Sequence, residues 1–276
     1  MSIEEIIDYA IEEDLREGDH TTLACIPKEA TNSAFLLVKE DGIIAGVEVA
    51  KKVFYKIDPK LEVEVKIQDG SVIKKGDEVL RVSGSSRSIL SAERLALNIL
   101  QRMSGIATHT NELVQLLHGL PTKLLDTRKT TPNFRVLEKM AVKIGGGENH
   151  RFGLFDMMMI KDNHIDYAGG ITEAIKSCKE YLKQRDMDLQ IEVEARNIEE
   201  VKEILKCGVD RIMLDNFDYE TLEKAVQLIG NSAETEASGG ITKATIRRYA
   251  ETGVDYISVG ALTHQISSLD LSLKAV

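Results

Sequence analysis

The sequence lacks the features of a disulfide-bonded, zinc-binding or membrane-spanning chain. Its only cysteines are Cys25, Cys178 and Cys207, and none of them forms a CxxC pair. This odd, dispersed set argues against a disulfide framework or a structural zinc site and is typical of thiols in a reducing compartment. No apolar run approaches the roughly 18 residues that a membrane-spanning helix needs. The N-terminal segment is acidic and amphipathic, unlike a secretion signal or a transit peptide, so we expect a soluble cytoplasmic protein without a membrane partner.

Two standard nucleotide-binding motifs are also missing. Neither GxGxxG nor GxxxxGK(S/T) follows a predicted strand, no His/Cys cluster suggests zinc or iron, and no serine or cysteine nucleophile motif is visible. The formal net charge of −10 disfavours nucleic acid as a partner, because a phosphate backbone requires broad positive surface. Cationic and donor residues nevertheless gather between Asp126 and Ile165. A local positive cluster in an acidic chain predicts a small anionic ligand.

The first part of the chain predicts a small mixed domain. Apolar residues at helical spacing predict a helix over 3–13, and short strands separated by turns are predicted over 31–85. Residues 47–57 predict a helix between these strands, and the alternation in 61–67 is that of a half-buried strand. A long helical run covers 88–118, and we expect Gly105 to interrupt it. These patterns predict an N-terminal α+β sandwich domain over residues 1–105.

The second part alternates short apolar strands with helices. Strands are predicted at TKLLD, MMMIK, LQIEVE, DRIMLD, TEAS and DYISVG, at the spacing of βα units. Such alternation predicts a parallel sheet, which leaves an open doubly wound sheet or a barrel. We favour an incomplete, TIM-like α/β barrel over 106–264, because the six strands recognised in this part of the sequence do not close a barrel in the usual way. The tail, 265–276, is free to pack on the N-terminal domain.

Polar or glycine-rich groups follow every predicted strand of the second part. In parallel α/β folds, this C-terminal edge of the strands is where ligands bind. Lys161, directly after an apolar strand, and Glu194, inside another, carry the most weight because a buried charge needs a partner or a ligand. The groups at the strand ends are Asp126–Lys129, Lys161–His164, Glu192–Glu194, Asp215–Asn216, Ser238–Gly240 and Val259–Ala261.

The side chains of this edge indicate the chemistry of the ligand. Glu194 and Asp215 can hold sugar hydroxyls, bind a divalent ion or stabilise a developing cation. The glycine turns at 238–240 and 259–261 offer backbone N–H groups to a phosphate. A Schiff-base role for Lys161 stays open as an alternative. The cations can bind several anionic groups, and arginine suits two-point contact with carboxylate or phosphate. These cations are Arg128, Lys129, His150, Arg151 and Lys161.

Long motifs in the chain resemble the quinolinate phosphoribosyltransferase family, whose enzymes are also called nicotinate-nucleotide pyrophosphorylases (carboxylating). The resemblance implies transfer of phosphoribosyl from phosphoribosyl pyrophosphate (PRPP) to quinolinate in NAD biosynthesis, giving nicotinate mononucleotide, pyrophosphate and carbon dioxide, with Mg²⁺ as cofactor. It also implies a sandwich domain, an incomplete barrel and a homodimer or larger homo-oligomer. The motifs are EDLREGDHTT, ERLALNILQRMSGIAT, DTRKTTP, KMAVKIGGGENHRFGLFD, MIKDNHI, IEVE, LDNF, SGGI and YISVGALTH, and they cover nearly the whole chain in order.

The resemblance further implies which residues contact the substrates. Arg94 resembles the arginine that enters a neighbouring subunit's active site. The turn Thr127–Lys129 resembles the substrate-contacting turn, and His150 with Arg151 resembles the pair that helps to hold the carboxylates of quinolinate. Lys161 resembles the lysine that contacts substrate or pyrophosphate.

The acidic residues and the glycine turns have implied roles as well. Glu194 and Asp215 resemble the acidic pair near the ribose and the metal, with the Mg²⁺ held largely by PRPP. The loops Ser238–Gly240 and Val259–Ala261 resemble those that bind the 5′-phosphate. The residues to which we assign a catalytic role are Lys129, Lys161, Glu194 and Asp215.

Three positions depart from the family pattern. Asn133 stands where a glycine is expected, and asparagine tolerates left-handed dihedral angles better than most residues. Glu148 stands where an apolar residue is expected, and we predict that it faces solvent or a cation. Ala237 replaces a serine, and His164 is expected to be a hydrogen-bonding residue at a strand end.

The alternative functions are a paralogous phosphoribosyltransferase that acts on another base and, more remotely, a Schiff-base aldolase.

Overall fold

The computed structural model describes residues 1–276, which form two compact units built from separate stretches of the chain. Unit 1 comprises Met1–Glu112, Lys129–Gly146 and Ala261–Val276. Unit 2 comprises Leu113–Arg128 and Gly147–Gly260. The domain boundaries expected from the sequence, 1–105 and 106–264, describe continuous segments, and that division stays a prediction.

Unit 1 contains a four-stranded antiparallel sheet with helices. Its strands are β1 (Thr31–Val38), β2 (Gly42–Ile43), β3 (Glu62–Val65), β4 (Val72–Ile73), β5 (Glu78–Ser85) and β12 (Leu271–Ala275). Its helices are α1 (Ile3–Leu15), α2 (His20–Cys25), α3 (Val47–Ile57), α5 (Arg135–Ile144) and α11 (Ala261–His264). The helix α4 (Ser86–Leu116) begins in unit 1, and its last residues belong to unit 2.

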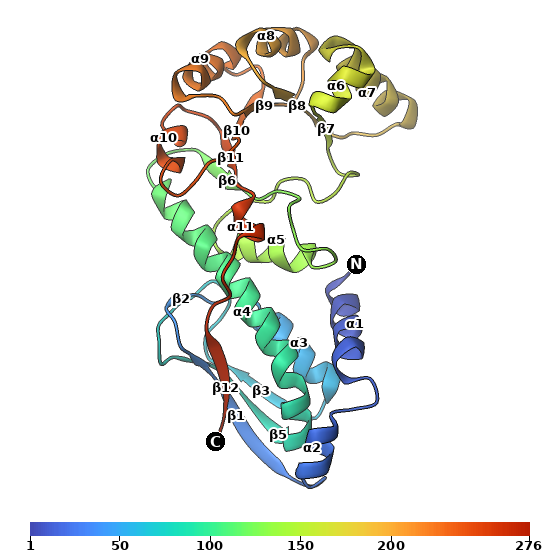
Figure 1. Ribbon diagram of the computed structural model, residues 1–276, viewed down its shortest axis with the longest axis vertical. Coiled ribbons are helices and arrows are strands. Elements are labelled where there is room, and N and C mark those ends of the chain that lie inside the picture. Colours follow the sequence, from blue (N-terminus) through green and yellow to red (C-terminus); the bar gives the residue numbers. More distant parts are fainter. The chain divides into compact units, whose positions relative to one another are not determined.

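The order of the main sheet in unit 1 is β12-β1-β5-β3, and β2 pairs with β4 separately. In β1, Ala34, Leu36 and Val38 are buried and alternate with more exposed residues, as expected for a strand that packs one face on a core. The C-terminal strand β12 runs antiparallel to β1, with Leu36 opposite Leu273 (Figure 1). The segment 271–275 is therefore an edge strand of this sheet.

The helix α4 is continuous through Gly105, so the predicted interruption is wrong. A Cβ atom at Gly105 would lie 2.3 Å from the carbonyl oxygen of Ser267. Glycine is therefore needed for the close approach of a neighbouring backbone, and the helix tolerates it at a cost of about 1 kcal/mol relative to alanine.

Unit 2 contains a six-stranded parallel sheet with helices. Its strands are β6 (Lys123–Leu125), β7 (Met158–Ile160), β8 (Ile191–Ala195), β9 (Arg211–Asp215), β10 (Glu234–Ser238) and β11 (Tyr256–Ser258). Its helices are α6 (Asp162–Ala168), α7 (Ile171–Arg185), α8 (Ile198–Cys207), α9 (Tyr219–Ile229) and α10 (Ile246–Ala250). All six strands predicted from the sequence are present.

The sheet of unit 2 has the order β6-β11-β10-β9-β8-β7. In Figure 1 the strands follow an arc, and α7, α8 and α9 lie on its outer side. The α/β class and the parallel sheet are confirmed, whereas β6 and β7 are the two ends of the hydrogen-bonded order, and barrel closure stays a prediction. No helix in either unit is both long enough and apolar enough to cross a membrane.

The register of unit 2 places several polar side chains on one face of the sheet. Arg211 of β9 is paired with Glu192 of β8 and with Glu234 of β10. Because side chains alternate along a strand, the residues two positions further on each strand share this face. We call this side of the sheet the polar face. Its members on the three central strands are Glu192, Glu194, Arg211, Met213, Asp215, Glu234, Glu236 and Ser238.

Candidate active site

The C-terminal ends of β7 and β8 bring Lys161 and Glu194 together. The Lys161 Nζ lies 2.8 Å from the Glu194 Oε2, and the Glu194 residue is only 9% exposed. Lys161 follows β7 directly, and its backbone N–H donates to Nδ1 of His164 at 3.0 Å. The prediction that His164 forms a hydrogen bond is confirmed, although His164 lies in the first turn of α6 and not at the strand end. Lys161 therefore presents an ammonium group that a nearly buried carboxylate holds in place.

Asp215 and Ser238 end the neighbouring strands on the same polar face as Glu194. The loops after their strands are joined, since the Asn216 N–H donates to the Ser238 carbonyl at 2.9 Å. Gly239 has a φ of +102°, and a Cβ atom there would lie 2.2 Å from the Asn216 Oδ1. Glycine is required by both the dihedral angle and this contact. The two strand ends therefore form one tightly packed rim.

The second glycine turn contributes less backbone than the sequence suggested. The side chain of Val259 is buried, and its N–H donates to the Leu125 carbonyl at 3.0 Å. The amide of Val259 is therefore not available to a phosphate. Gly260 is the last residue of unit 2, and Ala261 begins α11 in unit 1.

Arg128 and Arg151 both lie in unit 2, close enough for their charges to interact. Partial burial lowers the pKa of Arg151, and the charge of Arg128 lowers it further. The Arg151 Nη1 donates to the carbonyl of Met157 at 3.2 Å. No carboxylate forms an ion pair with either guanidinium, and Arg128 is exposed. Two interacting cations that form no ion pair of their own favour binding of an external anion.

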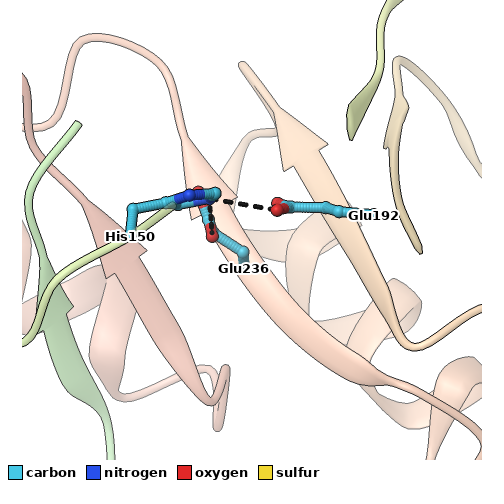
Figure 2. A group of neighbouring side chains, drawn as sticks. All are labelled: His150, Glu192 and Glu236. Atoms are coloured by element: carbon cyan, nitrogen blue, oxygen red, sulfur yellow. Dashed lines mark ion pairs between the residues drawn. The ribbon is translucent and has the colours of Figure 1, made fainter. Parts of the chain in front are cut away.

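His150 lies beside this pair but points into the interior. Its Nε2 is 3.0 Å from the Glu192 Oε2 and 3.2 Å from the Glu236 Oε2 (Figure 2). Both glutamates are 0% exposed and His150 is 7% exposed. Arg211, on the strand between them, lies 3.5 Å from Glu236 through Nη1. We call these four residues the His150 cluster.

The His150 cluster binds one additional proton, beyond the state with two ionised carboxylates and a neutral imidazole. Burial alone would lower the pKa of His150, but the two carboxylates outweigh it and raise this pKa to about 9. The Arg151 N–H donates to Nδ1 of His150 at 2.7 Å, which instead requires a neutral ring. Burial and the charge of Glu236 raise the pKa of Glu192, so Glu192 is the other place for the proton. Whether His150 or Glu192 carries the proton, the four residues of the cluster together have no net charge.

Glu236 is the carboxylate of the cluster that stays ionised. Its burial opposes ionisation, but hydrogen bonds from His150 and Ser258 and the charge of Arg211 bring its pKa below the ordinary value. The three side chains of His150, Glu192 and Glu236 also have the composition of a metal site. Their nitrogen–oxygen separations of 3.0 and 3.2 Å are those of close ion pairs, and the guanidinium of Arg211 disfavours a further cation.

Lys129 belongs to unit 1, where its loop is anchored by a buried carboxylate. Glu138 is 0% exposed and accepts hydrogen bonds from the Thr131 N–H at 3.0 Å and the Thr131 Oγ1 at 2.9 Å. Arg102 donates to the same carboxylate from Nη2 at 2.7 Å. The Thr263 Oγ1 donates to the carbonyl of Lys129 at 2.9 Å. The loop that carries Lys129 is therefore fixed from both sides within unit 1.

The departures from the family pattern have simple local explanations. Asn133 has a φ of +63°, a left-handed conformation that glycine adopts freely and asparagine adopts more easily than most residues. Glu148 is partly exposed, and its Oε1 lies 3.0 Å from the Nζ of Lys123. The prediction that Glu148 faces solvent or a cation is confirmed.

The residues predicted from the sequence fall into two groups. Thr127, Arg128, His150, Arg151, Lys161, Glu194, Asp215, Ser238, Gly239, Gly240, Val259 and Gly260 lie in unit 2, whereas Arg94, Lys129 and Ala261 lie in unit 1. Within unit 2 the structure pairs Lys161 with Glu194, and Arg128 with Arg151. Glu192, Glu236 and Arg211 were not predicted as site residues, although the two-residue alternation in IEVE and TEAS could have indicated the two glutamates.

The fold and the strand-end groups define an α/β protein whose parallel sheet carries charged and glycine-rich groups at its C-terminal edge. Residues 106–274 match the family "Quinolinate phosphoribosyl transferase, C-terminal domain", and residues 19–104 match its "N-terminal domain". The chain belongs to the quinolinate phosphoribosyltransferase family.

Curated relatives and solved structures agree with this assignment. The chain is 47% identical over 288 residues to "Quinolinate phosphoribosyltransferase (decarboxylating) 2b, mitochondrial" of Nicotiana tabacum, covering 99% of this chain and 82% of the relative. It is 40% identical over 273 residues to "Probable nicotinate-nucleotide pyrophosphorylase (carboxylating)" of Bacillus subtilis, covering 99% and 93%. The crystal structure of NadC from Streptococcus pyogenes superposes with a TM-score of 0.94 at 40% identity, covering 99% of this chain and 97% of that one.

Proposed function

We propose that the chain transfers phosphoribosyl from PRPP to quinolinate with decarboxylation, giving nicotinate mononucleotide, pyrophosphate and carbon dioxide. Family membership and the names of the curated relatives support this activity. The observation that carries the proposal is that the charges of Arg128 and Arg151 act on one another while neither guanidinium forms an ion pair with a carboxylate. Quinolinate has two carboxylates on adjacent ring carbons, and two guanidiniums can bind them with bidentate geometry.

The residues around this pair complete the binding of quinolinate in our proposal. Thr127 and Lys129 add contacts to the carboxylates. His150, which the sequence placed among these contacts, is buried with Nε2 facing Glu192 and Glu236, so it supports Arg151 from behind instead. Arg94 lies exposed on α4, which supports a role in reaching a neighbouring subunit's site. The protein would then act as a homodimer or a larger homo-oligomer, and its oligomeric mass can be measured by light scattering.

The reaction centre lies at Glu194 and Asp215 in our proposal. Departure of pyrophosphate leaves positive charge on the ribosyl carbon, and two carboxylates on the polar face favour that charge. Lys161 and Lys129 offset the charge that develops on the pyrophosphate. The quinolinate nitrogen becomes quaternary, and its positive charge stabilises the carbanion left on the adjacent ring carbon when carbon dioxide leaves. A proton from solvent then bonds to that carbon. Positioning and electrostatics suffice for both steps, so no covalent intermediate with the enzyme is expected.

Mg²⁺ is the proposed cofactor. Glu194 and Asp215 provide the hard oxygen donors that Mg²⁺ prefers, and their placement on one face suits a shared ion. Because two carboxylates cannot fill its coordination shell, PRPP would supply most of the remaining oxygens. The ion would neutralise charge on the pyrophosphate group when bound.

The 5′-phosphate of PRPP is proposed to bind at the two glycine turns. Ser238, Gly239 and Gly240 provide a hydroxyl and a turn with positive φ at both glycines, which suits close approach of a phosphate. Val259, Gly260 and Ala261 provide the second turn, where the buried Val259 side chain fixes the backbone.

A cytoplasmic location is also proposed. All three cysteines are free thiols, which supports a reducing compartment. Detection of the protein in a membrane or organelle fraction after cell fractionation would contradict this location.

The test of the function is incubation with quinolinate, PRPP and Mg²⁺, followed by chromatographic assay for nicotinate mononucleotide and pyrophosphate. Nicotinate in place of quinolinate should give no product, because it lacks the second carboxylate. Product from nicotinate and none from quinolinate would favour the paralogous transferase. The Lys161–Glu194 ion pair disfavours an aldolase, and borohydride in the presence of substrate should trap no adduct on Lys161.

A further inference from the structure

His150 connects the proposed quinolinate site to the interior of unit 2. The backbone before it is pinned to β6, since the Glu148 N–H donates to the Leu124 carbonyl at 2.8 Å and the Asp126 N–H donates to the Glu148 carbonyl at 3.1 Å. The His150 N–H then donates to the buried Asp126 carboxylate at 2.9 Å. The segment reaches residue 150 with a fixed path.

Both ring nitrogens of His150 have close polar neighbours. Nε2 lies between the carboxylates of Glu192 and Glu236, and Nδ1 accepts the N–H of Arg151 at 2.7 Å. Rotation of the ring would break both contacts and leave two fully buried carboxylates with only Arg211 and Ser258 as polar neighbours. A buried charge without its partner is strongly unfavourable, so the ring is held in one orientation.

We propose that Glu192, Glu236 and Arg211 are positioning residues for quinolinate, which act through His150 to fix the backbone of Arg151. This inference rests on the proposed function, because it assigns Arg151 to quinolinate. None of the three residues needs to touch substrate. Their task is to hold the imidazole, which in turn holds the N–H of Arg151, so that the guanidinium beside Arg128 is presented in a single direction.

The polar face explains how a buried cluster can influence the strand ends. Glu192 precedes Glu194 by two residues on β8, and Glu236 precedes Ser238 by two residues on β10. Two residues along a strand correspond to roughly 6.6 Å, so the cluster forms a layer directly below the proposed site residues. Glu192 also acts electrostatically on Arg151.

The decisive variants remove the carboxylate contacts without cutting a large cavity. Glu192→Met keeps a similar volume, and replacing buried charge by an apolar group is often tolerated. We expect the KM for quinolinate to rise at least tenfold, while the KM for PRPP stays within about twofold. Glu192→Gln keeps an oxygen acceptor for Nε2 and should restore the KM for quinolinate to within about threefold of the original chain.

Glu234→Met is the matched control. Glu234 lies on the same strand as Glu236 and pairs with Arg211 at 2.8 Å, but its carboxylate does not contact His150 and its side chain is 42% exposed. Both KM values should be unchanged within about twofold. The proposal is wrong if Glu192→Met raises the two KM values equally, or affects quinolinate no more than Glu234→Met does. It is also wrong if elemental analysis finds one metal ion per chain that Glu192→Met removes.

Nitrogen-15 NMR of labelled histidine tests the orientation without turnover. The Nε2–H proton of His150, assigned by its loss in His150→Gln, should appear far downfield and exchange slowly with water. Glu192→Met should shift it upfield and speed its exchange. If the Nε2–H proton of His150 exchanges with water as fast as that of a surface histidine, the positioning role is wrong. An inactive chain with quinolinate and PRPP would instead sink the proposed function, so the two failures are distinguishable.

Discussion

The two units each bury glutamate carboxylates, but they satisfy them in different ways. In unit 1, Glu138 receives donors on both oxygens, from Arg102 at 2.7 and 3.1 Å and from Thr131 at 2.9 and 3.0 Å. In unit 2, neither oxygen of Glu192 has a hydrogen-bond donor with good geometry, and its close neighbour is Nε2 of His150 at 3.0 Å. Both glutamates are 0% exposed, so the difference lies in their donors rather than in their burial.

Glu138 and Glu192 therefore differ in what holds them: Glu138 is fixed by hydrogen-bond donors, whereas Glu192 depends on a shared proton. A carboxylate with a full set of donors leaves those donors stranded when it is removed, so its loss is costly. A carboxylate held by a shared proton depends on that proton, so it responds to pH and tolerates a neutral replacement. Glu138 fixes the loop of Lys129 in the first manner, and Glu192 holds His150 in the second.

Removal of Glu138 should give the largest loss of stability. Glu138→Ala would leave the guanidinium of Arg102 and the amide of Thr131 without their acceptor. We expect a loss of about 3–5 kcal/mol in the free energy of unfolding, measured by urea denaturation. Glu4→Ala, which removes only an exposed pair with Lys52, should change it by less than about 1 kcal/mol. A loss below about 1 kcal/mol for Glu138→Ala would show that the fold does not need the Glu138 carboxylate.

The pH dependence of unit 2 should be the next largest effect. His150 and Glu192 share one proton, and the folded pKa of His150 is raised from 6.5 to about 9. The stabilising contribution of this shared proton is therefore complete below pH 6.5 and is lost as the pH rises through about 9. The difference in unfolding free energy between the original chain and His150→Gln should shrink over this interval by on the order of 3 kcal/mol. A difference that stays constant with pH would contradict the shared proton.

Glu192→Met should change stability much less than Glu138→Ala. The substitution removes a buried charge that lacks hydrogen-bond donors, and the remaining Glu236, Arg211 and His150 can form a neutral or singly charged set. We expect a change within about 1 kcal/mol in either direction, from the same urea titration. A loss as large as that of Glu138→Ala would erase the distinction between the two units.

The smallest effect is expected at Glu148. Its carboxylate pairs with Lys123 at a partly exposed position, and both side chains remain 44% and 54% exposed, respectively. Glu148→Val should change turnover by less than about twofold and stability by less than about 1 kcal/mol. A thousandfold loss of turnover would mean that this carboxylate belongs to the site after all.

Most elements of the fold could be predicted because their apolar periods are regular. The helix at 47–57 and all six strands of unit 2 are found where the pattern placed them. The short helices α2, α6 and α11 were missed, since four to seven residues carry too little periodicity. The interruption at Gly105 was wrong because its reason for being glycine is a contact with residue 267, which no local pattern reveals.

The residues at the strand ends could be predicted from the sequence. The contacts that hold His150 in place could not. Lys161 and Glu194 were recognisable as charges next to apolar strands, and they form an ion pair. The direction of His150 depends on a glutamate 86 residues further along the chain, at position 236, and on the register between strands. Such contacts arise only after the sheet has assembled, so sequence motifs name the residues but not the direction in which they point.

On β8, Glu192 and Glu194 alternate with apolar residues, so the register of this strand decides which side chains reach the polar face. A deletion or insertion of one residue before Glu192 would turn Val193 and Ala195 towards the polar face and send both glutamates into the apolar layer behind it. One inserted or deleted residue would thus displace both Glu192 and Glu194, and with them the proposed supporting layer and the proposed reaction centre. Length changes in this protein should therefore be sought in the loops between elements, and evolution or design can retune the active site only by substitution within these strands.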